Sequence, residues 1–211
     1  TDIDNGSTDN VGVTSLVLDT TAFTCADLGA NTVTLTVSDA AGNSTTCQAT
    51  VSVIDTTNPT VITQDIIVQL DATGNASIVA ADVNNGSSDN CSITQYNLVV
   101  SSFTCADVGA NTVTLTAIDQ SGNSASATAT VTVQDNIAPT VLTQDITVNL
   151  DDNGNAIIVA AAINNGSNDN CTASSDLVMS LDITAFTIAN LGANTVILTV
   201  EDASGNNTSA T

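Results

Sequence analysis

The side chains in this sequence that could bind a ligand are carboxylates and amides, which recur at a fixed spacing. The motif Asn-Gly-Ser-x-Asp-Asn begins at Asn5, Asn85 and Asn165, so each copy starts 80 residues after the one before. Carboxylate and amide oxygens close together around a glycine suit the hard cation Ca²⁺. The loop is therefore the best candidate for a calcium site, although turn formation, described next, is the favoured interpretation. The candidate ligands in and beside the motifs are Asp2, Asp4, Asp9, Asp82, Asp89 and Asp169.

The same loops allow a second interpretation, in which Asx side chains cap backbone amides within turns. The glycine lies one place early for an EF-hand loop, and Ala162 stands where the second copy has Asp82. Two more aspartates, Asp55 and Asp135, lie where one copy of the repeat meets the next. A cation there would stiffen the junction, although solvated turn carboxylates are again the alternative. Asp39 and Asp119 lie in hairpin turns of the repeat that precedes each junction, and they are expected nearby.

The composition excludes several classes of function. The 211 residues include no Lys, Arg or His, while 22 acidic residues give a formal charge of −22. Such a chain cannot neutralise phosphates, so we expect no binding to nucleic acid and no attraction to anionic lipid. It also lacks the usual general bases, and its acids recur at equivalent turn positions, so we expect no enzyme. No apolar run approaches the roughly 18 residues of a membrane span, so we expect no insertion into a membrane.

The strand pattern predicts an all-β fold. Residues 31–39 alternate between apolar and polar side chains, with Val33, Leu35 and Val37 on one face, and the pattern returns in each copy. Alternation of this kind is typical of half-buried strands. We therefore predict tandem immunoglobulin-like antiparallel β-sandwich repeats of about 80 residues that form a rod. The repeats are placed at 1–54 (N-terminally truncated), 55–134 (complete) and 135–211 (C-terminally truncated), as in a piece of a longer array.

Five cysteines are distributed over three equivalent positions of the repeat. These positions hold Val11, Cys91 and Cys171; Cys25, Cys105 and Ile188; and Cys47, Ala127 and Ala210. The economical prediction pairs cysteines within a repeat, as Cys25–Cys47 and Cys91–Cys105, and leaves Cys171 over. Buried free thiols are the alternative, because Cys47 shares the inward parity of Ala49 and Val51. The two pairings would also require all three positions to cluster in space.

Four segments carry a resemblance to a known family: VIDTTNPTVITQDIIVQLDATGNA, NNGSSDNC, SFTCADVGANTVTLT and DQSGN. They resemble the tandem repeats of giant surface adhesins in Bacteroidetes, including mobile adhesins of gliding motility, and HYR-type immunoglobulin-like domains in general. The resemblance covers the whole sequence. It implies export by the type IX secretion system and display as a long filament attached to the outer membrane. Val11, Ile188, Ala127 and Ala210 replace cysteines that are common in such repeats.

We therefore expect the structural stalk of a very large extracellular adhesin, used in surface adhesion and gliding motility. The alternatives are calcium-dependent ligand- or glycan-binding repeats and a non-catalytic spacer in a large secreted enzyme. Aromatic residues make up only 2% of the chain, which disfavours carbohydrate stacking. The expected partners are neighbouring repeats of the same chain, motility or secretion machinery, and an external surface or glycan bound by another part of the protein.

The resemblance also implies O-glycosylation at the Asp-Ser/Thr-x pattern. Two segments fit this pattern and would carry the sugar on Thr20 and Thr56. Short patterns of this kind also arise by chance, so the alternative is a pair of ordinary surface threonines.

Overall fold

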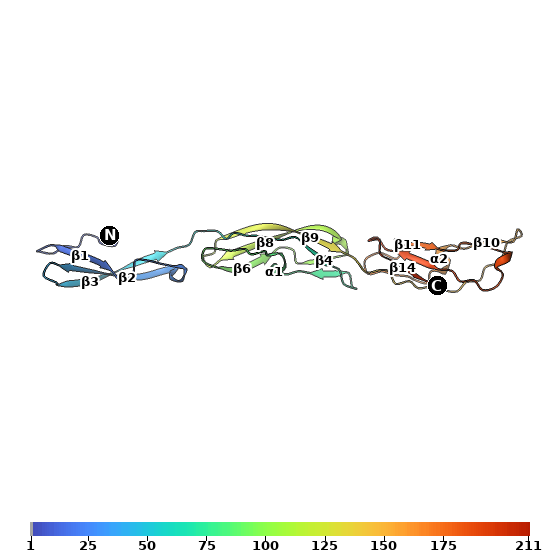
Figure 1. Ribbon diagram of the computed structural model, residues 1–211, viewed down its shortest axis with the longest axis horizontal. Helices are drawn as coiled ribbons and strands as arrows, with labels where there is room; N and C mark the ends of the chain where they lie inside the picture. Colours follow the sequence, from blue (N-terminus) through green and yellow to red (C-terminus); the bar gives the residue numbers. More distant parts are fainter. Residues whose placement is uncertain (1) are drawn as a thin grey trace. The chain divides into compact units, whose positions relative to one another are not determined.

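The computed structural model describes residues 2–211 and divides into two compact units. The first contains the chain up to Val61, together with Ser87–Tyr96 and Thr116–Ser126. The second contains Ile62–Gly86, Asn97–Leu115 and Ala127–Thr211. In the first unit, β1 (Val13–Leu18), β2 (Gly29–Asp39) and β3 (Ser44–Val53) form an antiparallel sheet in the order β1-β2-β3 (Figure 1). The alternation predicted for β2 is confirmed, because Val33 and Leu35 are buried.

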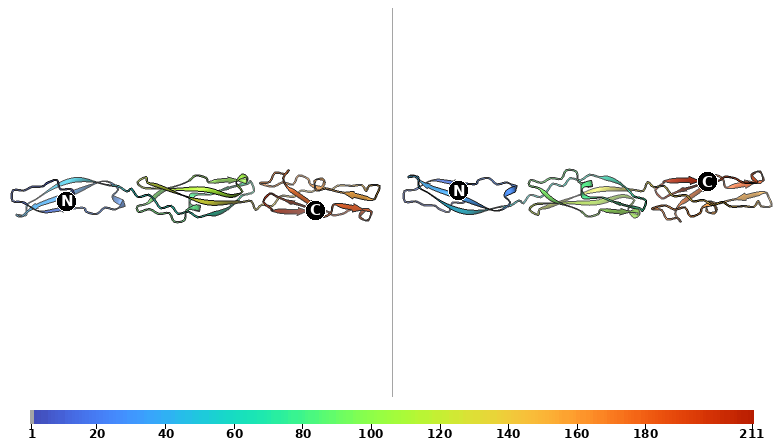
Figure 2. Two further views of the ribbon diagram at one scale, coloured as in Figure 1. Left: turned by 90° about the horizontal axis from the view of Figure 1, so that it is seen from above. Right: turned by 90° about the horizontal axis from the view of Figure 1, so that it is seen from below.

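The second copy of the repeat contains a four-stranded sheet in the order β4-β9-β8-β6. Its strands are β4 (Ile66–Gln69), β6 (Ile93–Leu98), β8 (Gly109–Asp119) and β9 (Ser124–Gln134). Val113 and Leu115 of β8 and Val131 and Val133 of β9 are buried. A smaller sheet pairs β5 (Asn75–Ser77) with β7 (Ser102–Thr104). The two views in Figure 2 show these strands running alongside one another.

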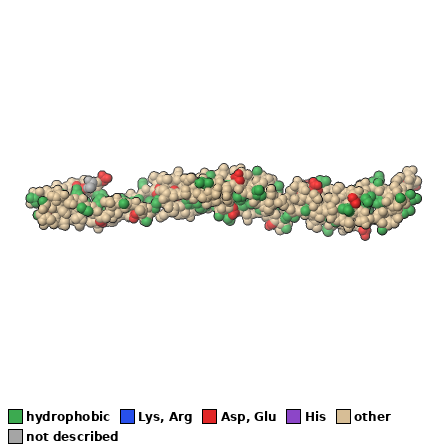
Figure 3. All heavy atoms as spheres, in the orientation of Figure 1, with side chains coloured by type: hydrophobic (Ala, Val, Ile, Leu, Met, Phe, Trp, Pro, Cys, Tyr) green, Lys and Arg blue, Asp and Glu red, His purple; other side chains and the backbone are tan. Residues whose placement is uncertain are grey.

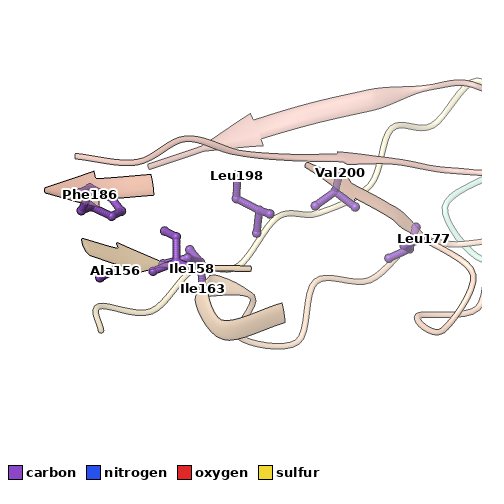
Figure 4. Packing of buried hydrophobic residues seen from close by; sticks show 7 residues of the cluster. All are labelled: Ala156, Ile158, Ile163, Leu177, Phe186, Leu198 and Val200. Carbon is purple, nitrogen blue, oxygen red and sulfur yellow. The ribbon is translucent and has the colours of Figure 1, made fainter. Parts of the chain in front are cut away.

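The third copy repeats this plan with shorter strands. Here β10 (Asn155–Ile157) pairs with β12 (Ala185–Thr187), and β13 (Leu198–Glu201) lies between β11 (Val178–Leu181) and β14 (Asn207–Ala210). The core contains Ala156, Ile158, Ile163, Leu177, Phe186, Leu198 and Val200 (Figure 4). In that view Leu198 and Val200 extend from β13 toward the side on which Ile158 and Ile163 lie. These aliphatic contacts, with a single aromatic ring, make up the core of the third copy.

The remaining elements are single turns of helix. They are η1 (Cys25–Asp27), α1 (Ala80–Val83), η2 (Cys105–Asp107), α2 (Ala160–Ile163) and η3 (Ile188–Asn190). None of the helices within residues 2–211 is long and apolar enough to span a membrane. The third copy has three more residues between Cys171 and Phe186 than the second has between Cys91 and Phe103. In this segment a turn forms in which the Asp176 N–H donates to the Ala173 carbonyl at 2.8 Å.

The all-β, immunoglobulin-like sandwich is therefore the fold of this chain. One pairing differs from the antiparallel expectation, because β4 runs parallel to β9 with Ile66 opposite Val131. The aromatic positions also differ between copies: Phe103 and Phe186 are buried opposite Ala76 and Ala156, whereas Phe23 is only partly buried. Phe103 and Phe186 lie in β7 and β12, which each pair with another short strand, whereas Phe23 lies outside the described strands.

Candidate functional site

Aspartates that are far apart in the sequence gather in two clusters. The first cluster consists of Asp55, Asp89 and Asp119, and the second of Asp135, Asp169 and Asp202. In each cluster one carboxylate oxygen from every member lies within 4.8 Å of the others. Each cluster lies wholly within one of the two compact units.

The members of each cluster come from three kinds of element. Asp55 and Asp135 follow the last strand of a repeat, after β3 and β9 respectively. Asp89 and Asp169 belong to the Asn-Gly-Ser-x-Asp-Asn loop, and the third members, Asp119 and Asp202, begin the hairpin turn after β8 or β13. The structure thus brings the junction and loop aspartates of the sequence prediction together. The third member was expected from the hairpin of the preceding repeat, as Asp39 or Asp119, but it comes from the hairpin of the following repeat, so that Asp119 lies with Asp55 and Asp202 lies with Asp135.

Each third member is held by its own turn. Asp119 Oδ1 accepts hydrogen bonds from the backbone N–H groups of Ser121 and Asn123, both at 2.8 Å. The side-chain amide of Asn123 donates to Asp119 Oδ2 at 2.7 Å and to the backbone carbonyl of Asp55 at 3.1 Å. In the second cluster Asn206 makes the same two contacts, to Asp202 Oδ2 at 2.8 Å and to the Asp135 carbonyl at 3.0 Å. This asparagine therefore fixes the hairpin carboxylate against the junction.

The loop aspartates are oriented by the backbone that follows them. Asp169 Oδ2 accepts the N–H groups of Cys171 at 2.9 Å and Thr172 at 2.8 Å. Asp89 Oδ2 accepts the N–H of Cys91 at 2.9 Å. The other oxygen of each carboxylate, Oδ1, is buried without a hydrogen-bond partner. One oxygen is thus used to hold the side chain, and the second is left available to a ligand.

The junction aspartates also have one hydrogen-bonded oxygen and one unpaired oxygen. Asp135 is only 4% exposed, and its Oδ1 accepts from Ile137 N–H at 3.2 Å and from the Asn170 side chain at 3.3 Å. Its Oδ2 is buried and unpaired, as are Asp55 Oδ2 and the side-chain oxygen of Asn170. Buried polar atoms are normally hydrogen-bonded, so unpaired oxygens beside two other carboxylates need an explanation.

A bound cation would provide that explanation. The three carboxylates of each cluster, which are buried or partly buried, carry like charges, and the sequence contains no Lys, Arg or His to offset them. An isolated buried charge is strongly unfavourable unless it is paired or coordinates a metal. Oxygens separated by at most 4.8 Å can all lie about 2.3–2.6 Å from one central Ca²⁺. The donor set, which is all oxygen, fits a hard divalent cation, and Asn170 would add an amide oxygen to the second cluster.

Asp119 is ionised readily in spite of its burial. Desolvation opposes the charged form, but hydrogen bonds from the side chain and backbone of Asn123 and from the backbone of Ser121 and Gly122 together lower the pKa of Asp119 below its ordinary value of 3.8. The hairpin therefore supplies a charged ligand at neutral pH.

The other predicted ligands lie outside both clusters. Asp2 and Asp9 are exposed, and Asp9 Oδ2 accepts the Val11 N–H at 2.8 Å. Asp4 Oδ1 accepts from the Ser7 N–H at 3.0 Å, and Asp82 Oδ2 caps α1 by accepting the Val79 N–H at 2.7 Å. For Asp4, Asp9 and Asp82 the structure shows the alternative interpretation, in which Asx residues cap backbone amides. Figure 3 shows acidic side chains at separate places on one face and no basic ones.

The predicted disulfide pairing is wrong. The bonds join Cys25 to Cys91 and Cys105 to Cys171, and Cys47 is a free, exposed cysteine. Each bond therefore links successive copies of the repeat, and Cys171, which was expected to be left over, is paired. Both bonds have Cα–Cα distances within the usual range for disulfides, 5.3 and 5.2 Å.

Strand register explains why pairing within a repeat fails. Cys47 lies in the middle of β3 opposite Leu35, whereas Cys25 precedes the start of β2, which is opposite Val53. Six residues of extended strand separate Cys47 from that end, a distance of about 20 Å. Cys91 lies near the end of β8, because the carbonyl of the adjacent Ser92 accepts from the N–H of Gln120, the residue just after β8. Cys105 lies near the other end, a few residues before β8 begins. The 11 residues of β8 span about 35 Å, which no disulfide can bridge.

The two predicted glycosylation positions are exposed. Thr20 lies in the loop after β1, and Thr56 lies in the segment between β3 and β4. Both hydroxyl-bearing residues are accessible, so the glycosylation of Thr20 and Thr56 stays a prediction.

No family model and no curated protein sequence matches this chain. The solved structures that align with it include Protocadherin Gamma C5 EC1-3, at 14% identity and a TM-score of 0.39, with 88% of this chain and 76% of that chain covered. Others are Protocadherin Gamma B7 extracellular cadherin domains 1-4 (12%, TM-score 0.36, 94% and 65% covered) and the human Desmocollin-1 ectodomain (14%, TM-score 0.29, 85% and 42% covered). The chain spans less than two thirds of the length of the Gamma B7 and Desmocollin-1 chains. With TM-scores below 0.5, these likenesses say nothing about function.

Proposed function

We propose that this chain is a run of structural stalk repeats from an extracellular adhesin. One observation carries the proposal: both described links between successive repeats combine a disulfide with a cluster of three aspartates. The Cys25–Cys91 bond occurs with the first cluster, and the Cys105–Cys171 bond with the second. A protein that bears load between a cell and a surface needs strong junctions, and these are the places where the chain concentrates its cross-links.

The extracellular location rests on the disulfides. Bonds of this kind form and persist in oxidising environments and are rare in the cytosol. The resemblance to Bacteroidetes surface repeats supports the finer proposal, which includes export by the type IX system, attachment at the outer membrane and use in gliding motility. Its partners would be neighbouring repeats, motility or secretion machinery, and an external surface or glycan bound elsewhere in the protein.

We further propose that Ca²⁺ is the cation of the two clusters. Carboxylate and amide oxygens are its preferred ligands, and extracellular modules bind it at about 10⁻⁴–10⁻³ M. When bound, the ion would neutralise most of the charge of three aspartates and hold together three segments of the chain. Asp55, Asp89 and Asp119 would hold one ion, and Asp135, Asp169 and Asp202 another.

Small-angle scattering tests the stalk, and thermal melting tests the cation. A single compact body of 211 residues would have a radius of gyration of about 17 Å, so a rod should give a clearly larger value in calcium. Melting with 10 mM calcium, with chelator and with sodium of equal ionic strength should show stabilisation by calcium alone. A radius near 17 Å would overturn the stalk, and equal effects of calcium and sodium would overturn the calcium assignment. Saturable glycan binding by this chain would favour a binding module instead.

A further inference from the structure

The second cluster and the Cys105–Cys171 disulfide share the residues 169–172. Asp169 begins this segment as a cluster member, and Cys171 carries the disulfide. The Cys171 backbone N–H donates to Asp169 Oδ2 at 2.9 Å, so the half-cystine itself orients the carboxylate. The unpaired Oδ1 is then held within the buried cluster.

Asn170, which lies between these two residues, contacts both features. Its side-chain amide donates to Asp135 Oδ1 at 3.3 Å and lies 3.3 Å from Cys171 Sγ. It also lies 3.4 Å from the backbone carbonyl of Asp71. The Asn170 side-chain oxygen is buried and has no hydrogen-bond partner. The same is true of Asp135 Oδ2, and the Asp135 side chain is only 4% exposed. The unpaired oxygens of Asn170 and Asp135 are therefore close, through a few contacts, to both the disulfide and the second cluster.

The far end of the disulfide is anchored in the preceding repeat. Cys105 is the first residue of η2, which the Thr104 side chain caps, and its Sγ packs against Gly74. The bond thus fastens residues 169–172 to an ordered element that contributes no ligand. Without the bond, the same segment would be held only by hydrogen bonds while three carboxylates repel one another.

We infer that the Cys105–Cys171 disulfide organises the second cluster for cation binding, so that oxidation of this pair and binding of Ca²⁺ favour each other. The inference rests on the calcium binding proposed above. By thermodynamic linkage, the factor by which the disulfide raises calcium affinity equals the factor by which calcium favours the disulfide over the dithiol. Couplings between sites typically amount to about 5- to 150-fold.

The affinity arm of the test uses the full chain with Asp89→Asn, so that the first cluster is disabled. Calorimetric titration with CaCl₂ compares this protein with the same protein carrying Cys105→Ser and Cys171→Ser. We expect calcium affinity to fall about 5- to 150-fold when the disulfide is lost. The matched control carries Asp169→Asn in place of Asp89→Asn, so its calcium affinity is that of the first cluster. That affinity should not change when Cys105 and Cys171 are replaced by serine. Equal affinity with and without the disulfide would overturn the inference.

The reciprocal arm uses the natural sequence, which avoids any misfolding of the variants. The protein is equilibrated in buffers of reduced and oxidised dithiothreitol, with calcium or with sodium of equal ionic strength. In reduction, one dithiothreitol gives up two electrons and two protons and forms its own ring disulfide. The Cys105–Cys171 bond takes these up and becomes two thiols, which alkylation and mass spectrometry count separately from Cys25 and Cys91.

The expected result is a shift of the thiol–disulfide equilibrium toward the disulfide in calcium. A tenfold coupling would lower the reduction potential of the pair by about 30 mV. An unchanged equilibrium in saturating calcium would overturn the inference while leaving calcium binding intact. Absence of calcium binding to the oxidised natural protein would overturn both the inference and the calcium assignment, so the two failures are distinguishable.

Discussion

Gly74 lies so close to Cys105 that a Cβ on Gly74 would come within 2.5 Å of the Cys105 Sγ atom. Such a Cβ would also lie 3.5 Å from Cys171 Sγ. The equivalent glycine of the third copy, Gly154, has nothing within 4 Å of the same position. The two glycines have almost the same backbone conformation, with φ of 75° and 76°. They differ in what lies against them, because the Cβ on Gly74 would meet both disulfide sulfurs and, at 3.3 Å, the Asn170 carbonyl oxygen.

This pair gives the first prediction. Gly74→Ala and Gly154→Ala should share the cost of a positive φ, about 1–2 kcal/mol. Gly74→Ala should lose about 1–3 kcal/mol more, because a sulfur held in a disulfide cannot move away freely. Thermal melting of the two variants measures the difference, and mass spectrometry reports whether Cys105–Cys171 still forms. Equal destabilisation by the two substitutions would show that the close approach to Cys105 has no energetic effect.

The second prediction concerns the free thiol. Alkylation of the unfolded, non-reduced protein should label one cysteine, and peptide mapping should find the label on Cys47, because the other four are paired. Cys47→Ser should change stability by less than about 0.5 kcal/mol, as for other exposed side chains. Labelled Cys171 would instead indicate pairing within a repeat, and more than one label would contradict the present connectivity.

The third prediction isolates a cluster charge. Asp169→Asn keeps the size of the side chain but removes a ligand charge, and it should reduce the stabilisation that calcium gives to the second unit. At 10 mM calcium and the affinities usual for extracellular modules, one site contributes about 1.4–2.7 kcal/mol. The matched control is Asp152→Asn, which removes the same charge from an exposed side chain. Melting of both variants in calcium and in chelator makes the comparison.

The third prediction has a clear contrary outcome. If Asp169→Asn and Asp152→Asn respond to calcium in the same way, calcium acts only by screening the total negative charge. The second cluster would then not be a specific site.

The two aspartate clusters show which parts of a candidate site can be predicted from the sequence. The repeat period located Asp89 and Asp169 in the loop motif, and the junctions supplied Asp55 and Asp135. Asp119 and Asp202 carry an equally regular signal, since they start the same Asp-x-x-Gly-Asn turn in each copy. The sequence places this turn near a junction, but it does not show which of the two junctions the turn meets. Only the folded chain shows the turn against the junction.

The cysteines show what sequence spacing cannot provide. A short separation along the chain favoured Cys91–Cys105, but in the fold these cysteines lie near opposite ends of the 11-residue strand β8. The pairs that form are 66 residues apart in sequence. Their pairing depends on which loop of one repeat meets the end of the previous one. That relationship is set by packing at the junction, and strand periodicity carries no information about it.

The last prediction is a pH dependence in the first unit. In the hairpin after β2, the Asn43 side chain donates to Asp39 Oδ2 at 2.7 Å, and the backbone N–H groups of Asn43 and Ala41 donate to Oδ1 at 2.8 and 2.9 Å. These bonds, led by the Asn43 side chain, lower the pKa of Asp39 below 3.8. Because the folded-state pKa lies below the unfolded value, ionised Asp39 stabilises the hairpin above pH 3.8. That contribution is lost as the pH falls through the folded pKa.

Carboxyl-carbon NMR titration of Asp39 in chelator measures this directly. The natural protein should titrate below 3.8, and Asn43→Ala should move the midpoint upward toward that value, because the largest stabilising donor is gone. Asn123→Ala provides the comparison, since it removes the equivalent donor from Asp119 in another hairpin and should leave Asp39 unchanged. A midpoint for Asp39 that does not move in Asn43→Ala would show that the backbone N–H groups alone hold the carboxylate. The conserved geometry of the Asp-x-x-Gly-Asn turn would then owe nothing to its asparagine, and the contact of Asn123 with the Asp55 carbonyl would be the remaining reason for an amide at that position.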